Sequence, residues 1–273
     1  MSKKLAYPFM AISISFGIAG CQEQTRETGA PQKEEQGSGE EENLEPAKWS
    51  YQGETGPEHW GEIAPEYSAC AEGEEQSPIN IDFSQTVKKD EMESIKTNYQ
   101  ESSFTLVNNG HTIQAEAASS NNNIVIDGEE YQLKQFHFHT PSEHLFNDQS
   151  YAMELHLVHE SESGKSAVLG VMMEEGEKND ALAEFWDELP SEQTDEKSGL
   201  EYSLDASSLL PEDQTTFQYG GSLTTPPCTE GVHWIIYEEP LELSKEQIQL
   251  FEQIYSDNHR PVQPLNDREL ITR

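Results

Sequence analysis

The stretch Gln135-Phe136-His137-Phe138-His139 alternates polar and aromatic residues, and Met153-Glu154-Leu155-His156-Leu157-Val158-His159 repeats a similar alternation. A period of two is typical of β-strands, in which side chains at positions i and i+2 lie on one face. His137 and His139 therefore share a face. If the second stretch forms a neighbouring strand, the ring of His156 converges with these two rings.

Three converging imidazoles are the ligand set of a catalytic zinc site, which keeps a fourth position open for water. Gln135 and Glu154 each stand two residues before a candidate ligand and can accept the N–H of its other ring nitrogen. The alternative is a group of hydrogen-bonded core histidines, because histidine is intermediate in burial. Three histidines in so short a span, two of them with an orienting partner, favour the metal site.

Residues 1–20 have the pattern of an export signal. Lys3 and Lys4 precede an apolar run that is too short to span a bilayer comfortably, and Ala19-Gly20-Cys21 follows. This ending resembles a bacterial lipobox, in which Cys21 is acylated and becomes the mature N-terminus. A plain signal peptide with a coincidental cysteine is the alternative. We therefore expect an exported protein that is lipid-anchored at the bacterial cell envelope, either in the periplasm or on the outer surface.

Residues 21–48 are predicted to be the lipidated cysteine and a flexible acidic tether. This part of the chain consists mainly of Glu, Gln, Gly, Pro, Ser and Thr, which cannot bury enough apolar surface to offset the entropy of ordering. The interspersed Gly and Pro argue against a helix. Residues 49–273 contain no second linker and no internal repeat, and we expect them to form one domain.

The chain is strongly acidic, with 52 Asp and Glu against 16 Lys and Arg and a formal net charge of −36. About −32 belongs to the domain once Lys3, Lys4 and the eight acids and two bases of the tether are set aside. Such a charge excludes binding to nucleic-acid phosphates. A solvated acidic face is the simplest explanation, and an excess this large also suggests a salty exterior.

The chain contains three cysteines. When Cys21 is assigned to the lipid, Cys70 and Cys228 are left to pair in an oxidising compartment. Two free buried thiols are the alternative.

Frequent turn signals separate short strand-like runs. The clearest runs are residues 104–107, 124–126, 131–138, 167–173 and 232–237. Helical patterns are limited to residues 180–189 and to the segment after Ser244, which forms a capping box with Gln247. The balance predicts a mainly β domain with a large sheet as the platform for the histidines.

From Trp49 to its C-terminus the chain resembles the alpha-class carbonic anhydrases, because eight motifs occur in the order of that family. The motifs are Gly56-Pro-Glu-His-Trp60, Gln76-Ser-Pro-Ile-Asn80, Asn108-Asn-Gly-His111, Gln135-Phe-His-Phe-His139, Ser142-Glu-His144, Glu154-Leu-His-Leu-Val-His159, Ser222-Leu-Thr-Thr-Pro-Pro227 and Asn258-His-Arg-Pro261. The resemblance implies a single domain on a large twisted, mostly antiparallel central sheet with a few short peripheral helices. It also implies a zinc-dependent lyase that interconverts carbon dioxide and bicarbonate.

The resemblance implies a role for several residues around the metal. The zinc ligands would be His137, His139 and His156, oriented by Gln135, Glu154 and the backbone at Asn258. Thr224 and Glu143 would form a pair that accepts the proton of a zinc-bound hydroxide. The pair would thereby aim the lone pair of that hydroxide at the substrate. A hydroxyl that donates to a buried carboxylate has only acceptor capacity left. Outside this context Thr224 would be a turn residue and Glu143 a surface acid.

His111 matches the proton shuttle of the family, on a loop at the mouth of the cavity. Its unperturbed pKa lies near neutrality, and Asn109-Gly110 before it is typical of a turn, which would let the ring swing. A solvated turn histidine is the alternative. The carbon dioxide site would be formed by Val158, Val168, Leu223, Thr225 and Trp234. The remaining histidines are interpreted as structural: His59, His144, His159, His233 and His259.

Two other functions fit parts of the pattern. His137, His139 and Glu143 have the spacing of the first cupin motif, in which Glu143 would be a fourth ligand to iron or manganese. The second cupin motif is absent from the sequence. The other alternative is a non-catalytic surface lipoprotein that binds zinc or a partner through a carbonic-anhydrase-like shell. Loss of a ligand histidine would mark that class, and all three are present.

Overall fold

The two alternating stretches form neighbouring strands of a large sheet in a computed structural model that describes residues 47–89, 95–194 and 200–273. Strand β7 is Glu129–His139 and strand β9 is Met153–Ser161. They pair antiparallel, with His137 directly opposite His156. The alternation therefore turns the histidines to one face of the sheet and Phe136, Phe138 and the β9 leucines to the other.

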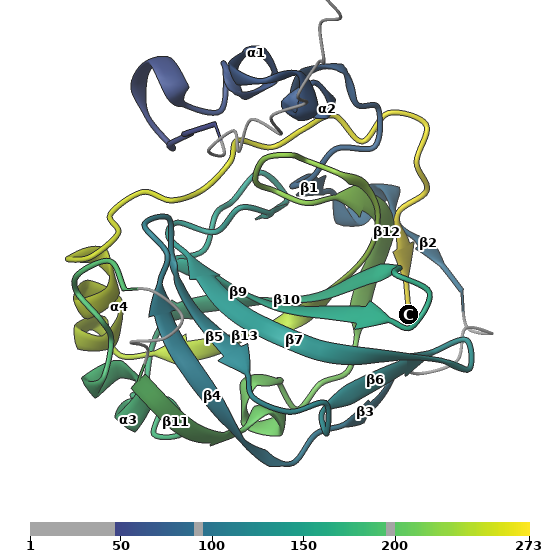
Figure 1. Ribbon diagram of the computed structural model, residues 1–273. Coiled ribbons are helices and arrows are strands. Elements are labelled where there is room, and N and C mark those ends of the chain that lie inside the picture. Colours follow the sequence, from purple (N-terminus) through teal and green to yellow (C-terminus); the bar gives the residue numbers. More distant parts are fainter. Residues whose placement is uncertain (1–46, 90–94, 195–199) are drawn as a thin grey trace, which may run out of the picture. The chain divides into compact units, whose positions relative to one another are not determined.

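Ten strands cross the sheet in the order β11-β4-β5-β7-β9-β10-β13-β12-β14-β2, and β6 and β3 extend it beside β7 (Figure 1). Within the described residues its pairs are antiparallel except β10 with β13 and β14 with β2. The remaining bounds are β2 (Val87–Lys88), β3 (Lys96–Asn98), β4 (Glu101–Asn108), β5 (Ile113–Ala117), β6 (Asn123–Ile126), β10 (Ser166–Glu175), β11 (Leu200–Asp205), β12 (Thr216–Ser222), β13 (Glu230–Leu243) and β14 (Ile271–Thr272). The prediction of a mainly β, mostly antiparallel fold on one large sheet is confirmed.

The strands run further than the apolar runs that predicted them. Strand β4, for example, covers Glu101–Asn108 where residues 104–107 were predicted, and its first residues alternate between exposed and buried. Ladder hydrogen bonds continue a strand past the point where its side chains carry a hydrophobic signal. The sequence therefore predicted the centres of the strands better than their ends.

Short helices and turns lie around the sheet. They are η1 (Gly53–Thr55), α1 (Trp60–Ile63), η2 (Pro65–Tyr67), α2 (Ala69–Glu72), η3 (Phe83–Gln85), α3 (Ala183–Asp187), η4 (Ala206–Leu209) and α4 (Lys245–Glu252). The capping box before α4 is present, with Ser244 and Gln247 bonding each other's backbone N–H. Helix α3 is shorter than the predicted 180–189, because the Glu188 N–H closes onto Phe185 and Pro190 follows soon after.

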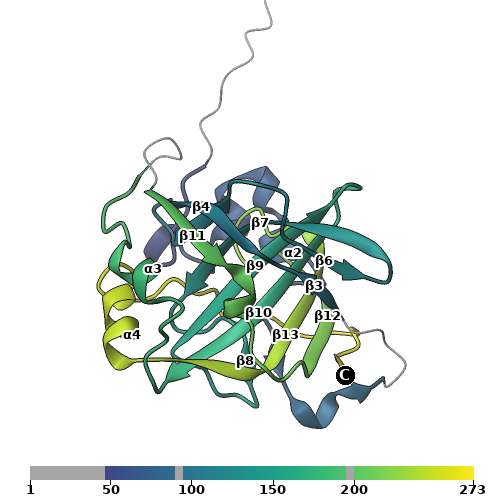
Figure 2. The ribbon, with the colours of Figure 1, turned by 90° about the horizontal axis from the view of Figure 1, so that it is seen from below.

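The main core lies on the face of the sheet opposite the histidines. Phe136 and Phe138 of β7 are fully buried there, and their rings contact Phe185 of α3. Figure 2 shows α3 and α4 together beside this part of the sheet. Burial of each such side chain contributes about 1.5–3 kcal/mol, so the alternation of β7 both builds the core and presents the histidines.

On the opposite side, the N-terminal helices lie against the end of the chain. Figure 1 shows the segment that follows α4 passing beside α1 and α2 before it reaches β14. A disulfide joins Cys70 of α2 to Cys228, with Cα atoms 5.1 Å apart, and the predicted pairing is confirmed. A small two-stranded sheet of β1 (Asn80–Ile81) and β8 (Leu145–Phe146) completes the fold.

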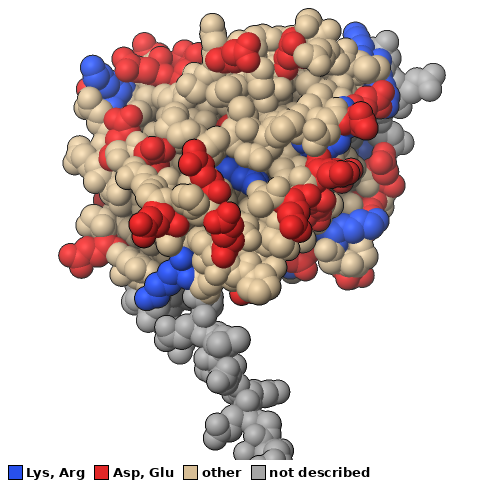
Figure 3. All heavy atoms as spheres, turned by 90° about the horizontal axis from the view of Figure 1, so that it is seen from above, with Lys and Arg blue, Asp and Glu red and all other residues tan. Residues whose placement is uncertain are grey.

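The predicted signal peptide, Cys21 and the tether up to residue 46 lie outside the described residues. The part of the chain that the structure describes contains no helix long and apolar enough to cross a bilayer. Acidic side chains are spread over the face shown in Figure 3, with few basic ones among them. This distribution agrees with a solvated acidic surface rather than one concentrated acidic patch.

Candidate metal centre

Two rows of side chains on one face of the sheet form the floor of the site. In the first row Gln114 of β5 lies opposite His137, and His137 lies opposite His156. The neighbouring row runs from Gln135 through Val158 and Val168 to Trp234. The register of the sheet therefore places a polar, imidazole-bearing region directly beside an apolar one.

The three candidate ligands converge as predicted, with one nitrogen from each within 4.8 Å of the others. Each ring bonds a protein acceptor through its other nitrogen: His137 Nδ1 to Gln135 Oε1 at 2.8 Å, His139 Nδ1 to the Asn258 carbonyl at 2.7 Å and His156 Nε2 to Glu154 Oε1 at 2.8 Å. Carbonyl and carboxylate oxygens only accept, so these ring nitrogens donate. The lone pairs of the remaining nitrogens, Nε2, Nε2 and Nδ1, are left for a metal.

The donor set fits a zinc ion. His139 Nε2 is buried and has no hydrogen-bond partner among the described residues. Burial of a polar atom without a partner costs free energy, and a bound metal ion would give this nitrogen the partner that it lacks. Burial lowers the pKa of all three imidazoles, to about 4 for His139, and keeps them neutral as metal ligands. Three neutral imidazoles with oriented rings are typical of a catalytic zinc site.

Glu154 joins the ligand strand to the loop that follows β7. Its Oε1 accepts from His156 and from His144 Nδ1, while its Oε2 accepts the backbone N–H groups of Glu143 and His144. Burial acts to raise the pKa of this carboxyl, but the two imidazoles outweigh it and hold the pKa well below its ordinary value. Gly170 leaves room for the carboxylate, because a Cβ there would stand 3.2 Å from Glu154 Oε1 and 2.5 Å from Ile236 Cδ1.

His144, interpreted as structural from the sequence, belongs to this hydrogen-bond cluster. Its Nε2 accepts from the Tyr219 hydroxyl at 2.6 Å. His144, Glu154 and His156 also lie close enough together to bind a metal, but their facing atoms already bond one another. His144 lies in a loop, and no strand period marked it in the sequence.

Glu143 is buried, with 1 % of its surface exposed, so it is not the surface acid that its sequence alone would suggest. Its Oε1 accepts the backbone N–H of Arg260 at 2.9 Å. Burial raises the pKa of the carboxyl, while His156 and the nearby Thr224 side chain act to lower it. The structure therefore brings the two members of the predicted pair together, with Thr224 at the wall of the cavity.

A cavity of about 220 Å³ opens above the histidines. It is lined by every residue that was predicted to contact the substrate: Val158, Val168, Leu223, Thr225 and Trp234. The polar side of the lining includes Gln114, Gln135 and Asn109. One wall is thus apolar and the other polar, with the candidate ligands between them.

His111 lies at this cavity, but its surroundings differ from the prediction of a freely swinging ring. The imidazole stacks on Trp49, with ring centroids 3.7 Å apart and planes 7° from parallel. Burial lowers the pKa of the half-buried imidazole, and Asn109 Oδ1 accepts the His111 backbone N–H. Trp49 and Tyr51, which also line the cavity, were missed because no sequence pattern links them to a residue so far along the chain.

Comparison with known proteins matches residues 55–273 to the family model described as "Eukaryotic-type carbonic anhydrase". The carbonic anhydrase of Klebsiella pneumoniae is 46% identical over 225 residues, which cover 82% of this chain and 90% of that protein. A carbonic anhydrase of Nostoc sp. is 42% identical over 82% of this chain and 85% of its own length. The alpha-carbonic anhydrase of Thermovibrio ammonificans, solved with the inhibitor sulfanilamide, superposes with a TM-score of 0.78 at 43% identity, covering 82% of this chain and 99% of that one.

Proposed function

The chain belongs to the eukaryotic-type, or alpha, carbonic anhydrase family, and we propose that it catalyses the reversible hydration of carbon dioxide with a zinc ion held by His137, His139 and His156. The observation that carries the zinc proposal is the convergence of three oriented imidazoles around the unpartnered Nε2 of His139. When bound, zinc supplies a nucleophile from water near neutral pH, the chemistry for which carbonic anhydrase itself is the standard example.

Glu143 and Thr224 aim the attack. The Arg260 N–H and the fold around Glu143 hold its carboxylate in place as an acceptor for the Thr224 hydroxyl. The Thr224 oxygen then has only acceptor capacity left on its cavity side. It can therefore accept a hydrogen bond from the attacking oxygen and turn the lone pair of that oxygen toward the substrate.

The apolar wall suits carbon dioxide, which is small and carries no net charge. Val168 and Trp234 are almost completely buried, and they lie beside the ligand row in the register of the sheet. An apolar surface at this point holds the substrate without competing for the hydrogen bonds of the nucleophile. Bicarbonate, which is charged and well hydrated, gains nothing from the same wall and is released to water.

His111 is the proposed acceptor of the proton that each hydration releases. The ring lies at the cavity wall in contact with Trp49 and is partly exposed, so it can pass a proton from the cavity to solvent. Burial lowers its pKa, which favours release of the proton to buffer once the imidazole has collected it. The proposal requires proton transfer through water between the site and this ring.

The two alternatives from the sequence lose support. A cupin site would use Glu143 as a ligand, but the sequence lacks the second cupin motif and the chain matches the carbonic anhydrase family over residues 55–273. A non-catalytic protein would not need the Thr224 and Glu143 pair or a complete ligand set, and the chain has both.

The test is a carbon dioxide hydration assay on the purified protein with metal analysis of the same sample. We expect close to one zinc per chain and activity that is lost with a strong chelator and restored by zinc. Iron or manganese in its place would favour the cupin alternative. Zinc without hydration activity would favour the non-catalytic one.

We also propose, from the sequence alone, that Cys21 is lipidated and anchors the enzyme at the bacterial cell envelope. Labelling of cells with a fatty-acid probe should mark the wild-type protein and leave a Cys21→Ala variant unlabelled. The variant should also appear in the soluble exported fraction. Equal labelling of both proteins would contradict the anchor.

A further inference from the structure

A coil segment without helix or strand supplies two backbone groups to the site. The Asn258 carbonyl accepts from His139 Nδ1 at 2.7 Å, and two residues later the Arg260 N–H donates to Glu143 Oε1 at 2.9 Å. The ligands on β7 and β9 are held by ladder hydrogen bonds, which this coil lacks. Something else must therefore fix the coil at the precision that an orienting hydrogen bond requires.

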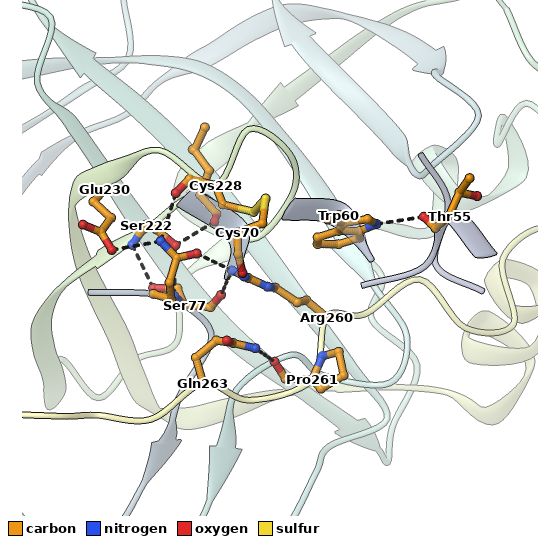
Figure 4. The surroundings of a disulfide bond; sticks show 12 residues. Thr55, Trp60, Cys70, Ser77, Ser222, Cys228, Glu230, Arg260, Pro261 and Gln263 are labelled. Atoms are coloured by element: carbon orange, nitrogen blue, oxygen red, sulfur yellow. Dashed lines mark hydrogen bonds between the residues drawn. A yellow bond between two sulfur atoms is a disulfide. The ribbon is translucent and has the colours of Figure 1, made fainter. Parts of the chain in front are cut away.

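Asn258 holds its own end of the coil through its side chain, and the side chain of Arg260 is the second anchor. It is 1 % exposed, and its guanidinium donates to Gln76 Oε1 at 2.9 Å and to the carbonyls of Ser77 and Cys70 at 2.7 and 2.8 Å. Its Cζ lies 5.7 Å from the ring centroid of Trp60. Figure 4 shows the arginine reaching from the coil into this N-terminal region. A buried guanidinium without such partners would be strongly unfavourable, so its fork-shaped donor set fixes the position of the coil.

The acceptors of Arg260 are themselves tied to the loop that carries Thr224. Cys70 is bonded to Cys228, and Gln76 Nε2 donates to the Cys228 carbonyl at 3.1 Å. The Cys228 N–H in turn donates to the Thr225 carbonyl at 2.8 Å. A series of contacts therefore runs from the loop that carries Thr224 and Thr225 through Cys228, the disulfide and Arg260 to Glu143.

We propose that Arg260 is a positioning residue of this enzyme. Its guanidinium sets the distance between the Thr224 loop and Glu143, and through Asn258 it sets the ring of His139. The inference rests on the proposed function, since it assigns Arg260 to the same pair and the same metal ligand. Arg260 itself lines no part of the cavity and touches no reacting atom.

Arg268 offers a control of the same residue type and similar contacts, although its side chain is more exposed than that of Arg260. Its Cζ lies 5.4 Å from the Tyr219 ring centroid. Its guanidinium also donates to backbone carbonyls: those of Leu265, Pro264 and Gly220. None of these contacts reaches residues 258–260.

The experiment compares Arg260→Gln, Arg260→Lys and Arg268→Gln with the wild type. For each protein the zinc dissociation constant is measured by chelator competition, together with kcat/KM for carbon dioxide and the thermal midpoint. We expect Arg260→Gln to weaken zinc binding about tenfold and to lower kcat/KM about 10–100-fold, as loss of an outer contact to a metal site does. Arg260→Lys should restore part of both, since an ammonium donates to the same carbonyls without the fork.

Arg268→Gln should lower the thermal midpoint while zinc affinity and kcat/KM stay within about twofold of wild type. If Arg260→Gln changes only the thermal midpoint, as the control does, Arg260 is structural and the inference is wrong. If Arg260→Gln does not fold, Arg260→Lys decides the question by the same two readouts. Absence of zinc and activity in the wild type would instead reject the proposed function.

A double-mutant cycle with Glu143→Gln separates action through Glu143 from general damage. With zinc kept at saturation, so that the route through His139 does not contribute, Arg260→Gln in that background should reduce kcat/KM by less than about twofold further, because the contact to Glu143 is already altered. An undiminished effect of Arg260→Gln in both backgrounds would overturn the proposed route.

Discussion

The candidate metal centre is built from two kinds of backbone. His137, His139 and His156 come from the centre of the sheet, where each strand has hydrogen-bonded neighbours on both sides. Asn258 and Thr224 come from coil, one shortly before the C-terminus and one in a loop between β12 and β13. The strand-borne residues supply the proposed ligands, and the coil-borne residues supply groups that would orient these ligands or the nucleophile.

The two regions reach the same precision by different means. In β7 and β9 the ladder fixes the backbone, and the period of two fixes the face to which each side chain points. In the coil the same result depends on Arg260, on the disulfide and on the Asn258 side chain, which donates to the carbonyls of Phe138 and His111 and accepts from the Thr140 N–H. The difference predicts that substitutions in the strands change the chemistry, while substitutions in the coil change chemistry and stability together.

The largest effect is expected for a ligand on a strand. His156→Ala should abolish zinc binding and carbon dioxide hydration, a loss well beyond the roughly 10–100-fold caused by an outer contact. The fold should persist, because the opposite face of β9 keeps its packing. Zinc analysis, activity and the thermal midpoint of the zinc-free protein test this. A zinc content equal to that of wild type would disprove the role of His156 as a ligand.

Removal of the disulfide tests the coil region. Cys70→Ser with Cys228→Ser should lower the free energy of unfolding by about 2–5 kcal/mol, because the bond closes a long loop between residues 158 positions apart. Activity should fall as well, since Cys228 lies directly after the Thr224 loop. Denaturant titration and kcat/KM measure the two effects. A large loss of stability with unchanged kcat/KM would show that the disulfide does not position the loop.

Orienting residues of the two regions can be compared directly. Gln135→Leu on β7 should weaken zinc binding about 10–100-fold with little change in stability. Asn258→Leu should weaken zinc binding and also lower stability, because its side chain holds the coil through three hydrogen bonds. Chelator competition and thermal melts provide both values. Equal losses of stability in the two variants would remove the distinction between strand and coil.

The ring of His111 is positioned neither by a strand ladder nor by the Arg260 anchor, because it stacks on Trp49. His111→Ala should slow steady-state hydration by at most about 100-fold, the lower end of what general acid–base groups contribute. It should spare the exchange of carbon dioxide and bicarbonate at chemical equilibrium, which needs no net proton export. Added imidazole buffer should restore part of the rate. Equal loss of both rates would make His111 structural.

Salt should have the smallest effect and should not distinguish the two regions. With 52 acidic and 16 basic residues, screening of surface repulsion should raise the thermal midpoint. A gain of about 2–4 °C corresponds to ~1 kcal/mol for a domain of this size. The gain should be the same with and without the disulfide. Arg260 and the disulfide, which anchor the coil, are both buried, so salt in the solvent does not screen them. Thermal melts of both proteins across a salt series measure it, and a flat or falling midpoint would contradict the prediction.

The strand-borne part of the site was predictable from local sequence. The alternation around His137 and His156 indicated their shared face, and the offset of two placed Gln135 and Glu154 as orienting partners. The coil-borne part was visible only through the family motifs, which implied the Thr224 and Glu143 pair and the backbone at Asn258. Arg260 stood in one of those motifs, but nothing in its neighbours revealed that its side chain is an anchor.

The sequence by itself determined which side chains face together along each strand, because a period of two is a local property of the backbone. It also determined the acidic surface and the pairing of Cys70 with Cys228. Only the tertiary structure decided that β7 and β9 are neighbours in a register that sets His137 opposite His156. It alone stacked His111 on Trp49 and brought Arg260 to the carbonyl of Cys70. Such contacts join residues far apart in the chain through burial and hydrogen bonding, and no local pattern encodes a distance of that kind.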